Sequence, residues 1–337
     1  MATETPIRVG VIGVGYLGAF HVEKLSRIID VELVGVADTN IVRAQEIANK
    51  FNITAFEHLE ELLPHVDALS IATPSQTHFE IAKEVLLAEK DLLVEKPLTH
   101  DLSEAEELVR IASEKGKILQ VGHIERFNAA LQVARPLITQ PLFIESHRLG
   151  PYSPRHEPID IVFDLMIHDL DLILSFQLDE VVSIDAIGAH VITPYIDIAN
   201  ARIKFSSGCI VNINASRVSP SASRKLRIWQ PEGCLSIDFQ KQQVNLMTTK
   251  PPKDNEKFPS IQTHHLDISH GDSLEREIAS FINAIKTRRL GEGSGHDVLP
   301  AISLATQIRD QINQNIVKTT TIAKENLKFN PLPETIQ

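Results

Sequence analysis

Cysteine is scarce in this sequence: the 337 residues include only Cys209 and Cys234. Two thiols cannot form the dense disulfide framework of small secreted domains, so we interpret both as buried thiols in a reducing compartment. Long hydrophobic runs are also missing, since no stretch approaches the roughly 20 apolar residues of a membrane-spanning helix. The first residues lack the basic segment and apolar core of a signal peptide. These absences predict a cytoplasmic protein with no membrane partner.

Positive charge is in the minority as well. The chain has 33 Lys and Arg against 44 Asp and Glu, which gives a net charge of −11. An acidic protein has no general affinity for nucleic acid, although a local basic pocket can still bind an anionic small molecule. Hydrophobic residues make up 43% of the chain. At this length, that content is sufficient for two hydrophobic cores and favours two domains.

The first 122 residues alternate between short apolar runs and helical patterns. We expect strands at residues 7–12, 31–37, 67–72, 91–94 and 118–121, and helices at residues 16–28, 41–50, 76–88 and 102–114. Strands that alternate with helices through short links predict a parallel, doubly wound sheet. The fold class is therefore α/β, with a Rossmann domain over residues 1–123.

The pattern changes after residue 124. We expect helices at residues 127–138, 159–176, 273–288 and 298–315, strands at residues 181–192, 196–205, 209–215, 226–230, 234–239 and 244–247, and a loop at residues 249–265. Consecutive strands without helices between them predict an open sheet that is mixed or largely antiparallel. Residues 124–337 are therefore predicted to form a second domain of the α+β class.

A glycine loop follows the first predicted strand and opens the first predicted helix. Gly13, Gly15 and Gly18 have the G-x-G-x-x-G spacing of dinucleotide-binding loops. The first glycine permits a tight turn, the second lets the backbone approach a pyrophosphate, and the third lets the helix pack against the strand. Tyr16 and Leu17, at the start of the helix, would present backbone amides to the pyrophosphate.

Asp38 ends the second predicted strand, 20 residues after Gly18. An acidic residue at this position accepts hydrogen bonds from the ribose hydroxyls and repels a 2′-phosphate. It favours NAD, with NADP as the less favoured cofactor because nearby Arg43 offers a cation for a phosphate. Thr73 and Pro74 follow the predicted strand at residues 67–72 and are expected to border the cofactor. His78, in the first turn of the next helix, is either a cofactor contact or a packing residue.

Glu95, Lys96 and Pro97 stand at the end of an apolar strand. The carboxyl end of a parallel strand faces the crevice in which a dinucleotide lies. Lys96 therefore places an ammonium beside the hydride-transfer site, where it can hydrogen-bond a reacting oxygen and stabilise developing negative charge.

Asp164 and His168 are four residues apart in a predicted helix, which puts the carboxylate and the imidazole on one face. Asp169 and Asp171 follow, so a metal site is one interpretation. An acid–base site fits better with a lysine at the nicotinamide, because alcohol oxidation needs a base for the hydroxyl proton. His168 suits that task near neutral pH, and Asp164 can hold a neighbouring hydroxyl. We therefore predict no metal.

Together these motifs resemble the glucose–fructose oxidoreductase/inositol dehydrogenase (Gfo/Idh/MocA) family over nearly the whole chain. The resemblance implies Lys96, Asp164 and His168 as catalytic residues, a sugar or cyclitol substrate, and a homodimer or homotetramer formed through the second sheet. The predicted cofactor-binding residues are Gly13, Gly15, Tyr16, Leu17, Gly18, Asp38, Thr73, Pro74, His78, Glu95, Lys96 and Asn128.

A narrower resemblance concerns residues 122–128, 149–155 and 164–171. These segments are similar to family members that act on nucleotide sugars, in particular those that oxidise the 3-hydroxyl of UDP-N-acetylglucosamine for 3-amino sugars of lipid A. The substrate residues it implies, besides the catalytic three, are Arg126, Arg148, Tyr152 and Arg155. Residues 150–158 are alternatively a proline-stiffened surface loop with solvated arginines.

Two further functions remain open. One is a dehydrogenase of a free polyol or sugar such as myo-inositol. The other is a non-catalytic sensor that binds NAD(P). The presence of Lys96, Asp164 and His168 together favours an enzyme, because a sensor has no chemical need for all three.

Overall fold

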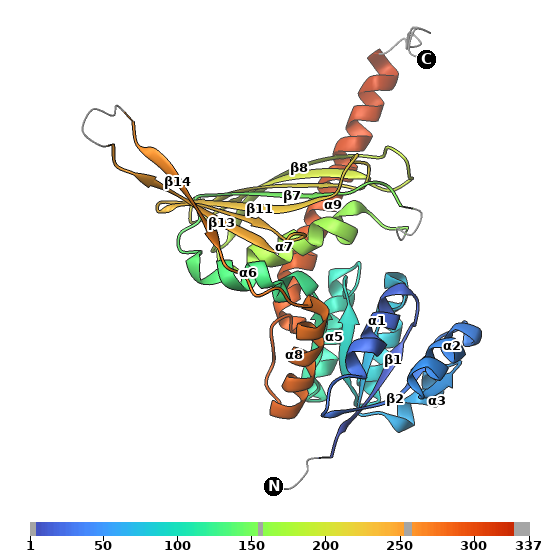
Figure 1. Ribbon diagram of the computed structural model, residues 1–337. Helices are drawn as coiled ribbons and strands as arrows, with labels where there is room; N and C mark the ends of the chain where they lie inside the picture. The colour runs from blue at the N-terminus through green and yellow to red at the C-terminus, as the bar shows by residue number, and fades with distance from the viewer. Residues whose placement is uncertain (1–4, 154–157, 253–257, 327–337) are drawn as a thin grey trace.

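The N-terminal half of the chain forms a six-stranded parallel sheet in the computed structural model, which describes residues 5–153, 158–252 and 258–326 (Figure 1). The strand order is β3-β2-β1-β4-β5-β6, as in a Rossmann fold. The strands are β1 (Ile7–Ile12), β2 (Val31–Ala37), β3 (Thr54–Phe56), β4 (Ala68–Ile71), β5 (Asp91–Glu95) and β6 (Leu119–Gly122). The doubly wound parallel sheet predicted from the alternating pattern is confirmed.

Helices connect these strands and cover the sheet. They are α1 (Tyr16–Leu25), α2 (Ile41–Phe51), the short α3 (Leu59–Leu62), α4 (His78–Leu87) and α5 (Leu102–Glu114). Polar caps begin two of them: Asn40 accepts a hydrogen bond from the backbone N–H of Arg43, and Asp101 accepts one from that of Ser103. The central strands β4 and β5 are buried along their whole length, which explains their nearly continuous apolar sequences.

The second half of the chain builds an eight-stranded sheet in the order β14-β13-β12-β11-β7-β10-β9-β8. Only β7 and β10 run parallel, while the other neighbours are antiparallel. The strands are β7 (Phe143–Leu149), β8 (Val181–Ala189), β9 (Ile198–Phe205), β10 (Ile210–Ser216), β11 (Ser223–Gln230), β12 (Gly233–Asp238), β13 (Gln243–Lys250) and β14 (Ser260–Leu266). The mixed, largely antiparallel sheet is as predicted.

Three local predictions in this half are wrong or incomplete. The predicted loop at 249–265 contains most of β14, which pairs with β13. Strand β7, in the middle of the sheet, is absent from the predicted elements. The helix predicted at 127–138 is interrupted: a 3₁₀ turn, η3 (Ile124–Phe127), precedes α6 (Ala129–Ala134), because Asn128 adopts an extended conformation and caps α6 through its side chain.

The predicted helix at 159–176 is also irregular. It begins with a π-helical turn, η5 (Val162–Met166), and continues as α7 (Ile167–Leu174). Figure 1 places α6 and α7 between the second sheet and the N-terminal domain. Helix α7 therefore presents one face to the large sheet and carries its first residues toward the cleft above the Rossmann strands.

The chain does not stay in the second domain after residue 123. Helix α8 (Ser273–Thr287) returns to the N-terminal sheet, where Ile278 and Phe281 share a buried core with Val9 and Val22. Helix α9 (Gly295–Asn326) contacts α5 near its start and β8 further along (Figure 1). These two helices join the domains. In the part of the chain that the structure describes, no helix is both long and apolar enough to cross a membrane.

Candidate active site

The glycine loop has the backbone geometry that only glycine tolerates. Gly13 has φ of +80°, and a Cβ there would lie 2.8 Å from Cγ2 of Thr73. A Cβ on Gly18 would overlap the carbonyl oxygen of Gly13, so the third glycine permits the close contact between loop and helix. Gly15 precedes α1 without a side-chain cap. The first backbone N–H groups of α1 therefore have no partner inside the helix and suit an anion.

Asp38 lies beside this loop at the end of β2. Its Oδ2 accepts a 2.8 Å hydrogen bond from the backbone N–H of Val14, and its Oδ1 accepts one of 2.8 Å from that of Asn40. Arg43 donates from Nε to the carbonyl oxygen of Val14 and pairs with Glu46. Asp38 and Arg43 thus both hold the glycine loop at Val14, the carboxylate through the backbone N–H and the guanidinium through the carbonyl oxygen.

Two adjoining cavities form one cleft along the carboxyl ends of the strands. The first, about 410 Å³, is lined by Asp38 and the glycine loop. The second, about 380 Å³, is lined by Tyr16, Lys96 and Asp164 among others. Both share Gly15 and residues 72–74. This is the crevice in which doubly wound folds bind dinucleotides, with Asp38 at one end and Lys96 at the other.

His78 and Glu95 support the walls of this cleft. The ring of His78 contacts the carbonyl oxygens of Pro97, at 2.8 Å, and Thr73, at 3.0 Å, and so ties two cleft-lining loops together. It lines neither cavity, which favours the packing role over the cofactor contact. Glu95 lies against His21, with 3.0 Å between Oε1 and Nε2.

Lys96 and Asp164 meet at the far end of the cleft. Lys96 Nζ donates a 2.7 Å hydrogen bond to the backbone oxygen of Asp164 and lies 3.5 Å from Oδ1 of its carboxylate. Both side chains remain slightly accessible, at 19% and 15%. Asp164 lies within η5, a π-helical turn, which is a distortion common at functional sites. The other carboxylate oxygen, Oδ2, is buried without a protein partner.

His168 lies just beyond this pair, in the first turn of α7, and is half-buried. Its ring is edge-to-face with that of His123, with 6.5 Å between the centroids. Burial, and then the positive charges of Lys96 and Arg148, lower the pKa of His168 well below its ordinary value. The imidazole is therefore neutral at pH 7 and available to accept a proton.

Comparisons with known proteins agree with this geometry. Residues 7–123 match the model described as "Oxidoreductase family, NAD-binding Rossmann fold", and residues 131–236 match the GFO/IDH/MocA C-terminal domain. The UDP-N-acetylglucosamine 3-dehydrogenase of Acidithiobacillus ferrooxidans is 38% identical over 288 residues, which cover 84% of this chain and 90% of that protein. The chain belongs to the Gfo/Idh/MocA oxidoreductase family.

Solved structures and other relatives fall in the same family. A structure of the Acidithiobacillus enzyme matches with a TM-score of 0.86 at 36% identity, covering 92% of this chain and 99% of that one. The scyllo-inositol 2-dehydrogenase (NAD(+)) of Bacillus subtilis is 31% identical over 238 residues, covering 64% of this chain and 69% of that protein. This Gfo/Idh/MocA chain is therefore an oxidoreductase that acts on a CH–OH group, with relatives that differ in substrate.

Three residues predicted to contact ligands are instead buried in polar networks of this Gfo/Idh/MocA chain. Arg148 is 2% exposed, and its guanidinium is paired with Asp169 and Glu125. Arg126 forms a two-bond pair with a carboxylate of α7, and Asn128 caps α6. Their donors are occupied by the protein, so these placements argue against direct contacts with cofactor or substrate. Tyr152 is 43% exposed, and Arg155 lies outside the described residues.

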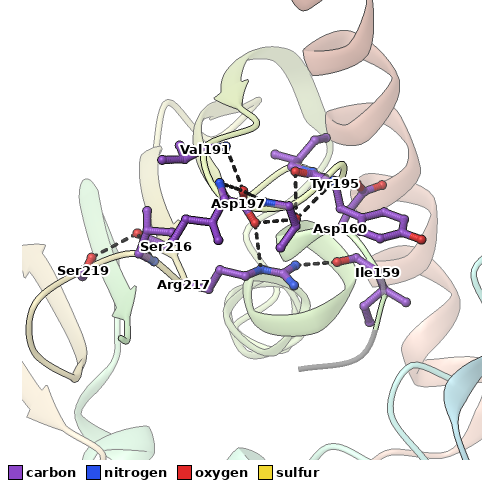
Figure 2. Close-up of polar contacts among 12 residues, drawn as sticks. Ile159, Asp160, Val191, Tyr195, Asp197, Ser216, Arg217 and Ser219 are labelled. Atoms are coloured by element: carbon purple, nitrogen blue, oxygen red, sulfur yellow. Dashed lines mark hydrogen bonds and ion pairs between the residues drawn. The ribbon is translucent and has the colours of Figure 1, made fainter. Parts of the chain in front are cut away.

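A buried ion pair fixes the segment that leads into Asp164. Arg217 lies between Asp197 and Ile159 (Figure 2), 3.7 Å from the carboxylate of Asp197 and hydrogen-bonded to the carbonyl oxygen of Ile159. Although burial opposes it, hydrogen bonds from three backbone N–H groups and the Thr193 hydroxyl lower the pKa of Asp197 to about 2. Since Ile159 lines the cavity beside Lys96, this pair holds one wall of the site.

Sequence reasoning missed several polar residues that are buried in the fold. They are His21, His123, Arg217 and Glu277. His123 stands within the segment that carried the nucleotide-sugar resemblance, and its position directly after a strand end was the available signal. Glu277 and Arg217 are polar residues inside amphipathic patterns. Only the tertiary structure brings them near the site.

Proposed function

We propose that this protein uses NAD to oxidise the 3-hydroxyl of a UDP-sugar such as UDP-N-acetylglucosamine. The contact of Lys96 with Asp164, at the end of a cleft that begins at Asp38, carries the proposal. It puts an ammonium and a carboxylate where the reacting carbon would lie beside the nicotinamide. The relation to the Acidithiobacillus enzyme supports the nucleotide sugar.

In the proposed reaction each of the three side chains has one task. Lys96 donates a hydrogen bond to the reacting oxygen and stabilises its developing negative charge. Asp164 accepts a hydrogen bond from a neighbouring sugar hydroxyl and fixes the ring. His168, neutral at pH 7 because of its lowered pKa, accepts the hydroxyl proton. NAD, when bound, supplies the acceptor for the hydride.

The choice of NAD over NADP rests on Asp38. Its carboxylate borders the first cavity and would face the ribose hydroxyls, where a 2′-phosphate would be repelled. Arg43 is held by Val14 and Glu46, so it would have to leave both partners to receive a phosphate.

The predicted role of Arg148 as a partner of the UDP diphosphate passes to Arg224 in this proposal. Arg224 of β11 pairs in register with Arg148 of β7, but its side chain is 50% exposed. Its guanidinium lies 3.9 Å from the carboxylate of Glu125, and its charge contributes to lowering the pKa of His168, which supports a role near the substrate. Tyr152 and Arg155 remain proposed partners of the nucleotide.

The assembly and cellular setting are part of the proposal. We place the enzyme in the cytoplasm, on a route to amino sugars of lipid A or surface polysaccharide. Large apolar side chains of β8 and β9 are exposed, including Val182, Ile187 and Ile198. Exposed apolar patches on a sheet mark association sites, which supports a homodimer or homotetramer formed through the second sheet.

The deciding test is NADH formation with UDP-N-acetylglucosamine, myo-inositol or glucose as substrate. An aminotransferase with glutamate should be present to remove the ketone. Of the three substrates, we expect only UDP-N-acetylglucosamine to increase the absorbance of NADH. We expect weaker activity when NADP replaces NAD. Activity with myo-inositol alone would instead support the polyol dehydrogenase, which the inositol dehydrogenases among the relatives favour. Bound NAD without turnover on any substrate would favour the sensor.

Replacing Arg224 by glutamine should separate nucleotide from sugar recognition. We expect KM for UDP-N-acetylglucosamine to rise about tenfold, with kcat within about twofold, because a charged hydrogen bond of roughly 1.4 kcal/mol is lost. Arg227→Gln on the same strand, 48% exposed and near Glu145, is the control and should leave KM unchanged. Equal KM values for both variants and the wild type would remove Arg224 from the site.

A further inference from the structure

A series of buried polar side chains leads from His168 into the N-terminal domain. The ring of His168 faces that of His123, and Nδ1 of His123 lies 3.4 Å from Oδ2 of Asp171. Glu277 is on α8, which packs against η3, the segment that directly follows His123. The negative charges of Glu95 and Asp171 both act on its carboxylate. These contacts connect α7, the end of β6 and α8 beneath the catalytic group.

The series ends near the surface. Gln120 of β6 donates a 3.2 Å hydrogen bond to the backbone oxygen of Glu277. Its own Oε1 lies 3.6 Å from the position that a Cβ on Gly291 would take. Gly291 belongs to the half-exposed loop between α8 and α9. The path therefore runs from the catalytic histidine to a loop that lines neither cavity of the cleft.

Atoms along this path share an unusual property. Among the residues that the structure describes, the buried side-chain atoms without a protein hydrogen-bond partner include Nδ1 of His168, Nδ1 of His123, both carboxylate oxygens of Glu277 and Oε1 of Gln120. Most buried polar atoms are paired with protein or with buried water. These atoms belong to elements that pack against one another. Unpaired buried polar atoms are where buried water binds, and such a water makes about three hydrogen bonds.

Glu277 is the residue whose state matters most. It is 0% exposed, and an isolated carboxylate is expensive to bury. Burial, with the negative charges of Glu95 and Asp171, raises the pKa of Glu277 well above its ordinary value. The group is therefore a protonated acid at neutral pH, able to donate from one oxygen and accept at the other.

We propose that His123, Glu277 and the buried water between them form the route by which the substrate's proton leaves the site. This inference rests on the proposed oxidation. It answers a physical need: nucleotide and sugar fill the cleft during the reaction, so His168 cannot release its proton to solvent on that side. His123 and Glu277 are positioning and relay groups that act through His168.

The proton balance is simple. The O–H bond of the substrate breaks, its proton binds one nitrogen of His168, and the hydride leaves with its electron pair to the nicotinamide. His168 then releases a proton from Nδ1 to water beside His123. Glu277 accepts that proton from the water at one oxygen and gives up its own from the other to a water beside Gln120, which passes a proton to solvent at the loop that holds Gly291. One proton enters the path and one leaves it, with every group restored.

Other charges along the path modulate this transfer. The groups that act electrostatically on His168, His123 or Glu277 are Glu95 of β5, Lys96, Arg126 of η3, Arg148 of β7, Asp171 of α7 and Arg224 of β11. Cations surround the histidines, which favours quick loss of the proton. Carboxylates surround Glu277, which favours its retention there.

The variant Glu277→Gln tests the route, with Glu275→Gln, an exposed residue of the same helix, as its control. Stopped-flow absorbance follows NADH, and a pH-indicator dye follows the proton. In Glu277→Gln we expect proton release and kcat to fall at least about tenfold, while the NADH burst and KM stay unchanged. Glu275→Gln should match the wild type. A His123→Asn variant should reproduce the effect of Glu277→Gln.

Each failure has a distinct signature. Wild-type rates of proton release in both Glu277→Gln and His123→Asn would overturn the route while leaving the proposed oxidation intact. If the wild-type enzyme failed to reduce NAD with every sugar tested, the proposed function itself would be wrong. Infrared spectroscopy reports on Glu277 without turnover: the band of a protonated carboxylic acid should disappear in Glu277→Gln, and its absence from the wild type would also overturn the route.

Discussion

Replacing Lys96 by alanine is expected to lower kcat by about 100- to 1000-fold, the usual cost of losing one donor to a developing negative charge. The reason is local: Lys96 Nζ lies 2.7 Å from the backbone oxygen of Asp164, at the end of the cleft. NAD binding should remain nearly intact, because Gly13 and Asp38 line the other cavity. Steady-state kinetics and titration of NAD by calorimetry measure the two effects.

A matched control comes from the opposite end of the same strand. The ammonium of Lys90, just before β5, also donates to a backbone carbonyl, that of Val66 at 2.9 Å. Lys90→Ala therefore removes a similar hydrogen bond far from the cleft and should leave kcat unchanged. If Lys96→Ala retained full turnover, or if Lys90→Ala lost as much, Lys96 would have no special role.

The Lys96→Ala variant should also change the pKa of His168, the proposed base. Burial is the main reason for the low pKa of His168, and the charge of Lys96 is the next. Without Lys96, the pKa of His168 should move upward, toward the ordinary value near 6.5. Histidine NMR signals followed through a pH titration detect that shift without turnover. An unchanged His168 titration would place Lys96 too far from the imidazole to act on it.

How far the sequence predicts this molecule depends on the range of the interactions. The glycine loop, Asp38 and Lys96 follow from patterns within about 30 residues: apolar strand, turn and helix. Such local signals predict the parallel sheet and the cleft because the carboxyl ends of its strands must meet at one edge. The glycine loop, Asp38 and Lys96 follow strand ends and therefore lie in the predicted cleft.

Long-range polar contacts explain the failures. Strand β7 escaped prediction because its inward positions include Ser146 and Arg148, which are buried although polar. Arg148 is tolerated there only because Asp169, 21 residues away, pairs with it. The local sequence does not distinguish a buried structural arginine such as Arg148 from an arginine that binds a diphosphate.

Helix α8 illustrates a second limit. Its apolar face predicts an amphipathic helix correctly, but periodicity does not say which surface the face will cover. The helix packs on the N-terminal core, and this return buries Glu277 beside Gln120 of β6. The π-helical turn that contains Asp164 is equally hard to predict, since an apolar pattern is the same in α and π turns.

Replacing Arg126 by alanine should destabilise the protein by about 3–5 kcal/mol, the cost of leaving a buried charge without its partner. Arg126 forms hydrogen bonds of 2.7 and 2.6 Å with the carboxylate of Asp171, which is 1% exposed. In the variant that carboxylate retains only the weak contact with His123. Urea denaturation measures the loss as a lower midpoint at unchanged slope.

A surface pair provides the control for this stability effect. Arg110 pairs with Glu114 at 2.6 Å, but both side chains are more than half exposed. Arg110→Ala should therefore leave the urea midpoint nearly unchanged, because solvent screens an exposed ion pair. The double change Arg126→Met with Asp171→Leu should recover part of the lost stability, because an apolar pair no longer leaves a charge unpaired.

The same variant separates the two roles considered for Arg126. If Arg126 binds the substrate, as the nucleotide-sugar resemblance implies, its replacement by alanine would raise KM and leave the urea midpoint unchanged. If Arg126 instead anchors Asp171, its replacement would lower the urea midpoint, and the folded fraction of the variant would keep KM near the wild-type value. Because both donor groups of Arg126 that face Asp171 are occupied, we expect the second result. A raised KM at full stability would return Arg126 to the substrate site.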